Sequence, residues 1–468
     1  MTDVQKNKQQ KIATFDDALP LYAPAPKDFT GKIGVEIEMP LVKQGATKPV
    51  IPTALEMQAL QKKLKDKGFD AQLEPAGVIE YAGPPFAVGD TLKLLKAMKT
   101  DIAAFDAAIA EAGYSRSPFS IVPTITKEEA LGNMVSRERL TASLKAMEEI
   151  FDANTLRLPM LTSSVQTSFS PEDNDQLFKM MYRAYALSPL LMASTNSSSG
   201  YVVNEDVKID YIPRAQYYLG YGAAGGISPA FLASSNGDEL VQNHIKAVFN
   251  APMHFAYDAN GGIIGATAEN RITFAKLVEQ GLNTQSNYEL AETFLYNDVK
   301  IANLRDENGA VVGKRMEVRG ADSGTDQPVM TVLMTAALVP DGKAAAAFDT
   351  LLKDYGFTGN PKADAALFLA SRKAVVENGG KFMDVPFGSG RLLDFAADVA
   401  GGILVNAYDG KVPAKDMERM MDVLMTGNTD AKIFAEKFAS LKDASDYLLQ
   451  APQNAANNNQ QPKASARP

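Results

Sequence analysis

Residues 31–39, GKIGVEIEM, are the stretch of sequence from which the fold can be inferred. Apolar side chains occupy every second position of it: Ile33, Val35, Ile37 and Met39. This period of two is typical of a strand with one buried face. Glu36 and Glu38 fall together on the other face, about 7 Å apart, where two carboxylates repel each other unless a positive charge lies near them. The stretch therefore predicts a sheet with one polar face that carries a charged site.

Three further segments show the same division into an apolar and a polar face. The polar positions are Glu74 and Glu80 in residues 71–85, Arg315, Glu317 and Arg319 in residues 314–324, and Thr162, Ser164, Gln166 and Ser168 in residues 161–170. Glu74 and Glu80 flank a Pro–Ala–Gly kink, with Val78 and Ile79 beside the second carboxylate. Four strands of this kind predict a sheet whose polar face gathers acids, amides and arginines.

The residues alone leave two interpretations of this polar face open. One is a solvated sheet face, on which acids and arginines form weak surface pairs. The other is a site for a hard divalent cation, because Mg²⁺ takes oxygen ligands and often bridges carboxylates to phosphates. Five glutamates on three strands with almost no lysine among them favour the second interpretation. Arg319 would then offer its planar guanidinium to phosphate oxygens.

The rest of the chain reads as helices between these strands. Apolar residues recur at helical spacing in residues 55–69, 91–113, 137–153 and 174–194, and the chain from about residue 341 to 450 is mostly helical. This alternation predicts an α+β fold with one mixed or antiparallel sheet. We expect a flexible segment at 1–28, a single catalytic domain at 29–450 and a disordered tail at 451–468, which is rich in Asn, Gln, Ala and Pro.

Composition excludes several classes of function. The chain has 468 residues, with 47 Lys and Arg against 56 Asp and Glu, a net charge of −9, which argues against nucleic-acid or membrane partners. It has no cysteine, so thiolate metal sites, cysteine nucleophiles and disulfides are excluded. The first 17 residues lack the apolar core of a signal peptide, and no apolar run reaches the ~18 residues that span a bilayer. We expect a cytoplasmic protein.

Several quoted motifs together resemble a known family. The segments IGVEIEM, LEPAGVIEYAG, SVQTSFS, RMEVRGADSG and VPFGSGRLLDFAADV occur in this order between about residue 29 and residue 440. In sequence and order they resemble the glutamate–cysteine ligases, most closely the type found in plants and many proteobacteria. The resemblance implies a glutamine-synthetase-like fold, in which a curved, mainly antiparallel sheet surrounded by helices forms a funnel for the active site.

The resemblance also implies a reaction and its residues. ATP phosphorylates the γ-carboxylate of glutamate, and the cysteine amine attacks the acyl phosphate to give γ-glutamylcysteine, the first step of glutathione biosynthesis. The cofactor is Mg²⁺, with Mn²⁺ as an alternative, and the partners are the small molecules glutamate, cysteine and ATP. The implied metal ligands are Glu36, Glu38, Glu74, Glu80, Gln166 and Glu317. Arg319 corresponds to the arginine that steadies the transferred phosphoryl group, and the implied substrate contacts are Arg214, Ser168 and Asn196.

Two departures from the family pattern leave the substrate open. Ser168 stands where the pattern has Asn, and TNSSSG at 195–200 has Ser where a Pro and an aromatic residue are usual. One alternative is a related γ-glutamyl or other carboxylate–amine ligase with a different amine or acid. Another is a relative that binds a ligand without turnover, although the presence of all five glutamates and Arg319 speaks against it.

Two other signals carry less weight. GYGAAG at 220–225 fits the pattern G-x-G-x-x-G, but Pro229 follows where a helix should continue, so we expect a glycine-rich loop and no dinucleotide site. His244 and His254 are the only histidines. Neither has a metal-ligand partner at helical or strand spacing, and we expect both to be structural.

Overall fold

A central sheet of antiparallel strands organises the molecule. The computed structural model describes residues 10–133, 138–150, 161–379 and 385–458. Within these residues the main sheet has eight strands: β1 Lys32–Lys43, β2 Ala71–Glu74, β3 Val78–Ala82, β4 Phe86–Ala87, β5 Tyr114–Arg116, β6 Ser164–Phe169, β11 Val299–Arg305 and β12 Val311–Asp322. The order is β11-β12-β6-β1-β3-β2, with β4 and β5 paired to β1, and every pairing is antiparallel. The predicted antiparallel sheet is confirmed.

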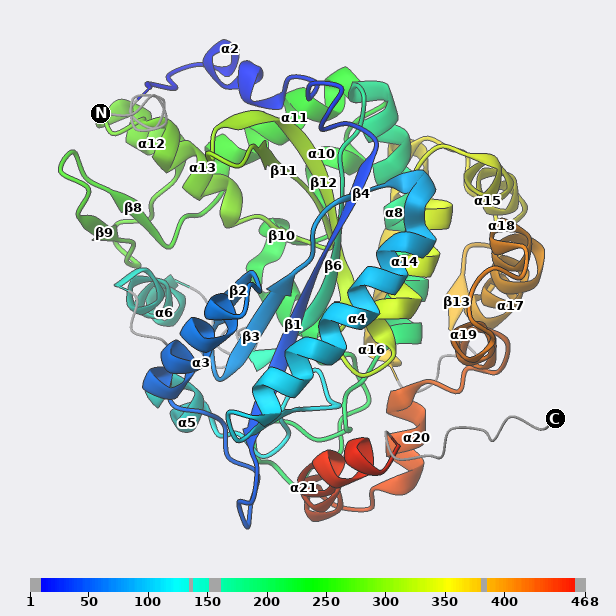
Figure 1. Ribbon diagram of the computed structural model, residues 1–468. Helices are drawn as coiled ribbons and strands as arrows, with labels where there is room; N and C mark the ends of the chain where they lie inside the picture. Colours follow the sequence, from blue (N-terminus) through cyan, green and yellow to red (C-terminus); the bar gives the residue numbers. More distant parts are fainter. Residues whose placement is uncertain (1–9, 134–137, 151–160, 380–384, 459–468) are drawn as a thin grey trace.

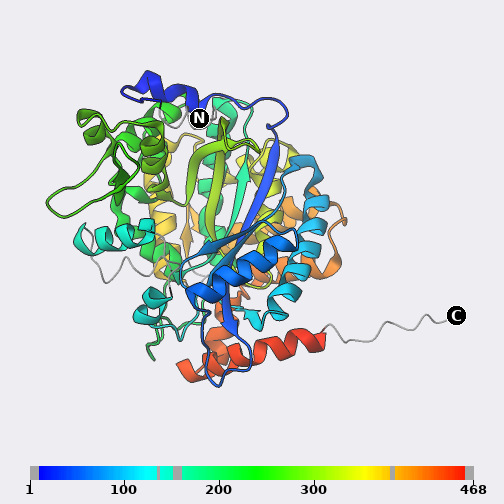
Figure 2. The ribbon, with the colours of Figure 1, turned by 60° about the vertical axis from the view of Figure 1, so that its left-hand side comes forward.

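The apolar face of this sheet packs on helices. The alternating residues of β1 are buried as predicted: Ile33, Val35, Ile37 and Met39 are at most 2% exposed. They belong to one large core with α8 Asn174–Thr195, α14 Gln327–Leu338 and α4 Thr91–Ala110. Figure 1 shows these three helices together on one side of the strands, and Figure 2 shows the strands crossing the molecule side by side.

Helices and short hairpins form the remainder of the described chain. The helices are α2 Phe15–Ala18, α3 Ala54–Asp66, α5 Lys127–Gly132, α6 Glu138–Ile150, α9 Pro213–Tyr218, α10 Pro229–Leu232, α11 Gly237–Asn250, α12 Phe274–Glu279, α13 Gln285–Thr293, α15 Lys343–Asp354, α16 Pro361–Glu377, α17 Leu392–Asp398, α18 Val405–Tyr408, α19 Ala414–Thr426, α20 Asp430–Lys437 and α21 Leu441–Asn458. The short strand pairs are β7 Gly225–Gly226 with β10 Tyr296–Asn297, β8 Phe255–Tyr257 with β9 Ile263–Gly265, and β13 Pro386–Phe387 with β14 Gly390–Arg391. The helices predicted from periodicity correspond to α3, α4, α6 and α8. The helical region predicted from about residue 341 corresponds to α15–α21.

Part of the N-terminal segment is packed onto the fold. The Ile12 N–H donates to the Asn283 carbonyl (2.8 Å), and the buried Lys314 donates from Nζ to the Tyr22 carbonyl (2.8 Å). Thr14 caps α2, and the short 3₁₀ helix Leu19–Tyr22 follows it. Flexibility was predicted for residues 1–28; of these, 1–9 lie outside the described residues, and Ile12 and Tyr22 are buried.

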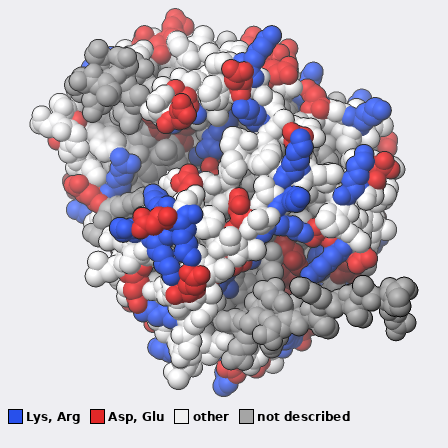
Figure 3. Space-filling model, viewed as in Figure 1, with Lys and Arg blue, Asp and Glu red and all other residues white. Residues whose placement is uncertain are grey.

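The C-terminal helix continues beyond the predicted start of the tail. α21 runs from Leu441 to Asn458, past residue 451, and residues 459–468 lie outside the described part of the chain. Among the described residues no single helix is long and apolar enough to cross a membrane. α14 and α15 pass that test only as a pair, with a bend of 85° between them. On the face drawn in Figure 3, Lys and Arg side chains alternate with Asp and Glu.

Candidate active site

The polar face of the sheet brings most of the predicted site residues together. Glu38 in β1 lies opposite Glu80 in β3, and Glu36 lies opposite Gln166 in β6. Farther along, Glu317 in β12 lies opposite Ser168 in β6. Glu74 ends β2 on the same face as Gln72, which pairs with Glu80. Strands from four parts of the chain thus place acids, amides and hydroxyls side by side.

Cations surround Glu317 at one end of this face. Its carboxylate accepts a hydrogen bond from Arg319 and forms an ion pair with Arg315 at 2.9 Å. Lys300 in β11 lies 4.0 Å away. Burial alone would raise the pKa of Glu317, but Lys300, Arg319 and Arg315 outweigh it and hold that pKa well below its usual range. Glu317 is therefore an ionised carboxylate that fixes two guanidinium groups.

Glu38 is held by neutral donors in the middle of the face. It accepts hydrogen bonds from the Ser164 N–H (2.6 Å), the Ser164 hydroxyl (2.9 Å) and Gln166 Nε2 (3.0 Å). The Oε1 atom of Gln166 in turn accepts from Arg319 (2.8 Å). Gln166 thus connects the predicted phosphoryl-binding arginine to the acids of β1.

Negative charge accumulates at the opposite end, between β1 and β3. Burial, together with the charges of Glu36, Glu38, Glu74 and Glu317, raises the pKa of the Glu80 carboxyl to about 9. The pKa of Glu36 is also raised, mainly by burial, although Arg315 at 3.6 Å partly offsets this. Within the described residues, no group of three or more Asp, Glu or His side chains is arranged so that it could hold a metal ion as it stands. This end of the site carries more carboxyl groups than nearby cations.

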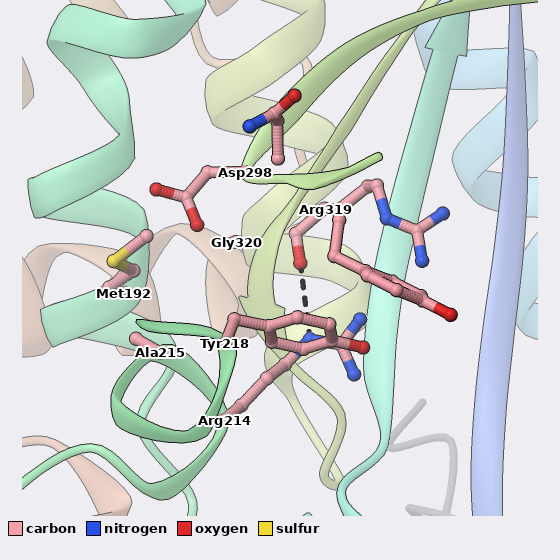
Figure 4. A pocket seen from close by; sticks show the side chains of 9 residues that line it. Met192, Arg214, Ala215, Tyr218, Asp298, Arg319 and Gly320 are labelled. Atoms are coloured by element: carbon pink, nitrogen blue, oxygen red, sulfur yellow. Dashed lines mark hydrogen bonds between the residues drawn. The ribbon is translucent and has the colours of Figure 1, made fainter. Parts of the chain in front are cut away.

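A small pocket adjoins the arginine end of the face (Figure 4). The space between its lining residues is about 250 Å³ with the open mouth included, but only about 10 Å³ of it is accessible to solvent, the room of about one water molecule. The lining residues are Met192, Arg214, Ala215, Tyr218, Tyr296, Asn297, Asp298, Arg319 and Gly320. Arg214 donates from Nε to the Arg319 carbonyl (3.4 Å), and its guanidinium lies 4.9 Å from the centre of the Tyr218 ring. Arg214 also lies 3.6 Å from Glu38. The two arginines singled out from sequence therefore meet at one pocket.

A second, more open pocket lies along β11 on the side of α13. Its volume is about 880 Å³ including its mouth. Basic residues contribute much of the lining: Arg139, Lys300, Arg305 and Arg315. Glu289 pairs with Arg305 there (2.7 Å), and Glu292 also lines the pocket. Lys300 and Arg315 face both this pocket and the ion pairs of Glu317.

The two remaining predicted substrate residues have structural partners. The Ser168 hydroxyl accepts a hydrogen bond from Arg315, so it lies within the site. The buried Asn196 donates from Nδ2 to the Gly379 carbonyl (3.1 Å), and its Oδ1 accepts from the Ser198 N–H (3.1 Å). Asn196 is not among the residues that line either pocket.

Sequence reasoning missed Lys300 and Asp322. An irregularity in β12 between Val318 and Ala321 inserts one extra residue against β6, so Asp322 pairs with Ser164 and returns to the polar face. Burial raises the pKa of Asp322 to about 6, while hydrogen bonds from Ser120 (2.8 Å) and the Ser197 N–H (3.3 Å) oppose that rise. Alternation of residues alone does not reveal such an insertion.

The signals that were set aside lie outside the acid cluster. His244 pairs with Glu292 at 2.9 Å, and His254 is buried among the rings of Tyr221, Phe294 and Tyr296. The glycine-rich residues 219–224 form a 3₁₀ helix with a kink at Gly222. The glycine-rich segment, which was expected to be a loop, is therefore a 3₁₀ helix.

Comparisons with known proteins agree with the motifs. Residues 32–200 match the family model of glutamate–cysteine ligase family 2 (GCS2). No curated protein matches the chain. A solved glutamate–cysteine ligase from Francisella tularensis, in complex with AMP, superposes over 94% of this chain and 91% of that one, with 13% identity and a TM-score of 0.55.

Two other solved structures are more distant. They are the complex between the prokaryotic ubiquitin-like protein Pup and its ligase PafA (10% identity, 90% and 72% coverage, TM-score 0.36) and a glutamine synthase homolog (11% identity, 86% and 69% coverage, TM-score 0.28). The expected α+β fold with a mainly antiparallel sheet is confirmed, and the chain shares its fold with the glutamate–cysteine ligase in complex with AMP. The predicted resemblance to the glutamate–cysteine ligase family is confirmed over residues 32–200, the part of the chain that carries Glu36, Glu38, Glu74, Glu80 and Gln166.

Proposed function

We propose that this protein is an ATP-dependent ligase that joins the γ-carboxylate of L-glutamate to the amine of L-cysteine through an acyl phosphate. The observation that carries the proposal is the position of Arg319. Its guanidinium is fixed by Glu317 and Gln166 and lies between the acids of β1 and the pocket that contains Arg214. An acyl phosphate forms only where the negative charge of the transferring group is neutralised by fixed donors.

The donor atoms at the β1–β3 end are of the type that suits a hard divalent cation, and the carboxylates would rearrange to share it. Its ligand atoms are carboxylate and amide oxygens, which Mg²⁺ and Mn²⁺ prefer. Burial and the neighbouring carboxylates both raise the pKa of Glu80, and a bound cation would oppose this shift. Glu36, Glu38 and Glu80 would hold it, with Glu74, Gln166 and Glu317 as further candidates. When bound, the cation neutralises the phosphates of ATP.

Lys300 in β11 and Arg315 in β12 would bind the phosphates of ATP from the side opposite the divalent cation. Arg315 and Lys300 lie between Glu317 and the open pocket along β11, so a nucleotide in that pocket would direct its phosphates toward them. Arginine offers a planar fork to phosphate oxygens, and a buried lysine offers a point charge. We assign the open pocket to ATP on this ground.

We assign the small pocket to the amino-acid substrate, which requires the pocket to widen, because its accessible space of about 10 Å³ admits only about one water molecule. Arg214 is buried there and stacks on Tyr218, an arrangement in which a guanidinium can bind the α-carboxylate of glutamate through two parallel hydrogen bonds. The γ-carboxylate would then lie toward Arg319. Its oxygen attacks the terminal phosphorus of ATP and ADP leaves. The amine next attacks the acyl carbon, phosphate leaves, and the nitrogen loses a proton.

One experiment tests this function. Phosphate release is measured with Mg²⁺–ATP and L-glutamate across a panel of amines, beginning with L-cysteine, and the peptide product is identified by mass spectrometry. We expect phosphate and γ-glutamylcysteine in equal amounts. The variant Arg391→Lys, which alters an exposed pair with Asp394 (2.7 Å), serves as a control that should remain active.

The same panel decides between the alternatives. The departures at Ser168 and Asn196–Gly200 favour a different amine as the second candidate, because Ser168 binds Arg315 at the site itself. Turnover with another amine and none with cysteine would support that candidate. A protein that binds ATP but releases no phosphate with any amine would refute ligase activity.

A further inference from the structure

A buried ion pair lies directly beside the two arginines of the small pocket. Asp298, at the junction of β10 and β11, is 6% exposed, and Arg372 of α16 is 3% exposed. Arg372 donates from Nε and from one terminal nitrogen to the two carboxylate oxygens of Asp298, at 2.5 and 3.0 Å. This two-point contact fixes both the distance and the orientation of the side chains.

The pair also contacts the backbone next to each pocket arginine. The Arg319 N–H donates to the Asp298 carbonyl (2.8 Å). On the other side, Arg372 donates to the carbonyl of Ala215 (3.2 Å), the residue after Arg214. Figure 4 shows Asp298 and Ala215 near the two arginines, with the Arg214–Arg319 hydrogen bond between them. The backbone of Asp298 therefore holds β12, which presents Arg319, while its side chain, through Arg372, reaches α9, which presents Arg214.

Neighbouring backbone leaves little room for the pair to shift. The Asp298 N–H donates to the Gly226 carbonyl (2.9 Å). Gly226 has φ of 67°, and a Cβ added there would lie 3.2 Å from Arg372 Cζ. A side chain at this position would displace the guanidinium, so the close approach requires glycine. Asp298 on one side and Gly226 on the other thus fix the position of the Arg372 guanidinium.

We propose that Asp298 and Arg372 are positioning residues that set the spacing between Arg214 and Arg319. This inference rests on the proposed function, in which Arg214 binds the glutamate α-carboxylate and Arg319 steadies the phosphoryl group. The spacing of the two guanidinium groups then decides whether the γ-carboxylate reaches phosphorus. A misplacement of about 1 Å can cost about 10²-fold in rate.

The chain offers a matched control pair away from both pockets. Arg183 of α8 binds Asp349 of α15 through two contacts of 2.8 Å and also binds Asp341 (2.9 Å). Its chemistry is the same, but neither it nor Asp349 lines a pocket at the site. A buried or half-buried ion pair is by itself weak evidence of a role in stability, so the comparison must be made on activity.

The first test compares Asp298→Asn and Arg372→Lys with Arg183→Lys. We expect kcat to fall by about 10-fold or more for the first two variants and the KM for glutamate to rise, because both arginines are displaced. The KM for the amine should stay within about 2-fold, and Arg183→Lys should behave as wild type. Equal effects of all three variants would show a structural role and overturn the inference.

A double-mutant cycle shows whether Asp298 affects kcat through Arg319. If Asp298 acts through Arg319, then Asp298→Asn should cost little further kcat in an Arg319→Lys background. The full loss in both backgrounds would contradict the inference. If Asp298→Asn fails to fold, Arg372→Lys, which keeps the charge but loses the fork, replaces it in the cycle.

A second measurement does not depend on turnover. Hydrogen exchange followed by mass spectrometry should show faster exchange in peptides that cover residues 213–218 and 317–322 for Asp298→Asn and Arg372→Lys, but not for Arg183→Lys. Unchanged exchange in these peptides would overturn the inference even if the wild type is active. A wild type without ligase activity would refute the proposed function alone, since the exchange result still decides whether the pair holds the two segments.

Discussion

At the scale of single residues, charge placement distinguishes the site from an ordinary solvated sheet face. Glu317 is 1% exposed and ionised, and two arginines and a lysine surround it. Glu80, on the same face, has a pKa raised to about 9 by burial and by neighbouring carboxylates. Among the described residues, Arg315, Arg319 and Lys300 thus gather around Glu317, whereas Glu36, Glu38 and Glu80 gather between β1 and β3. Such separation is typical of a functional site.

Arg319→Lys should reduce kcat by about 10²–10³, because a donor aimed at transition-state charge contributes roughly 3–4 kcal/mol. Lysine keeps the charge but loses the planar guanidinium, whose other nitrogens would bind phosphate while Nη1 donates to Glu317 and Gln166. The KM for the amine should change little. Steady-state kinetics measures this fall in kcat, with Arg391→Lys as the control variant. A lower melting temperature with unchanged specific activity would mean that Arg319 only forms a structural ion pair.

Glu80 should make the stability of the metal-free protein depend on pH. Its folded-state pKa of about 9 lies above the ordinary value of 4.5, so the bound proton stabilises the folded state. This contribution is fully present below pH 4.5 and is lost as pH rises through about 9. In EDTA, the melting temperature should therefore fall more between pH 6 and pH 9.5 for the wild type than for Glu80→Gln, which cannot ionise.

Added Mg²⁺ should reverse this trend. A cation favours the ionised carboxylate, so its binding releases a proton and its apparent affinity rises with pH up to about 9. Glu80→Gln should bind Mg²⁺ more weakly and with less pH dependence, which calorimetry in buffers of different ionisation enthalpy detects. Binding without proton release would place the cation elsewhere.

At the scale of elements, the alternation of residues predicted β1, β3, β6 and the centre of β12 together with their buried faces. Alternation could not predict the extra residue in β12 that returns Asp322 to the polar face, because an insertion against β6 leaves no mark in one strand's own pattern. Lys300 and the pair Asp298–Arg372 were missed for another reason. Their partners are distant in sequence, and only tertiary packing brings them together.

The 3₁₀ helix Leu19–Tyr22 should contribute to stability through one buried network. Tyr22 donates its hydroxyl to Glu292 (2.7 Å), which also pairs with His244. Tyr22→Phe leaves a buried acceptor with one donor fewer, which costs about 1–3 kcal/mol of unfolding free energy. Urea unfolding measures the loss. Tyr81→Phe, which removes a hydrogen bond to the less buried Asp101 (2.6 Å), should cost less. No loss for Tyr22→Phe would mean that this segment is not docked in solution.

At the scale of the whole molecule, two pockets adjoin the same polar face of the sheet. The small pocket lies at Arg214 and Arg319, and the open pocket lies along β11 at Lys300 and Arg315. Glu317 contacts cations from both. Ligands in the two pockets would therefore meet over one ionised carboxylate, which is what a transfer between a nucleotide and an amino acid requires.

Binding of Mg²⁺ and ATP should be mutually dependent and should raise the melting temperature together. A ligand at 100 times its Kd stabilises the folded state by about 2.7 kcal/mol. ATP with EDTA should give a much smaller shift, because the carboxylates of Glu36, Glu38 and Glu80 would then repel the triphosphate. Thermal shift assays with ATP, Mg²⁺ and both together measure this dependence. Arg315→Lys should reduce the combined shift, whereas Arg183→Lys should keep it after correction for its own melting temperature. An equal shift by ATP with and without Mg²⁺ would show that the nucleotide binds apart from the acids of β1 and β3, and the shared face would then not be the site of phosphoryl transfer.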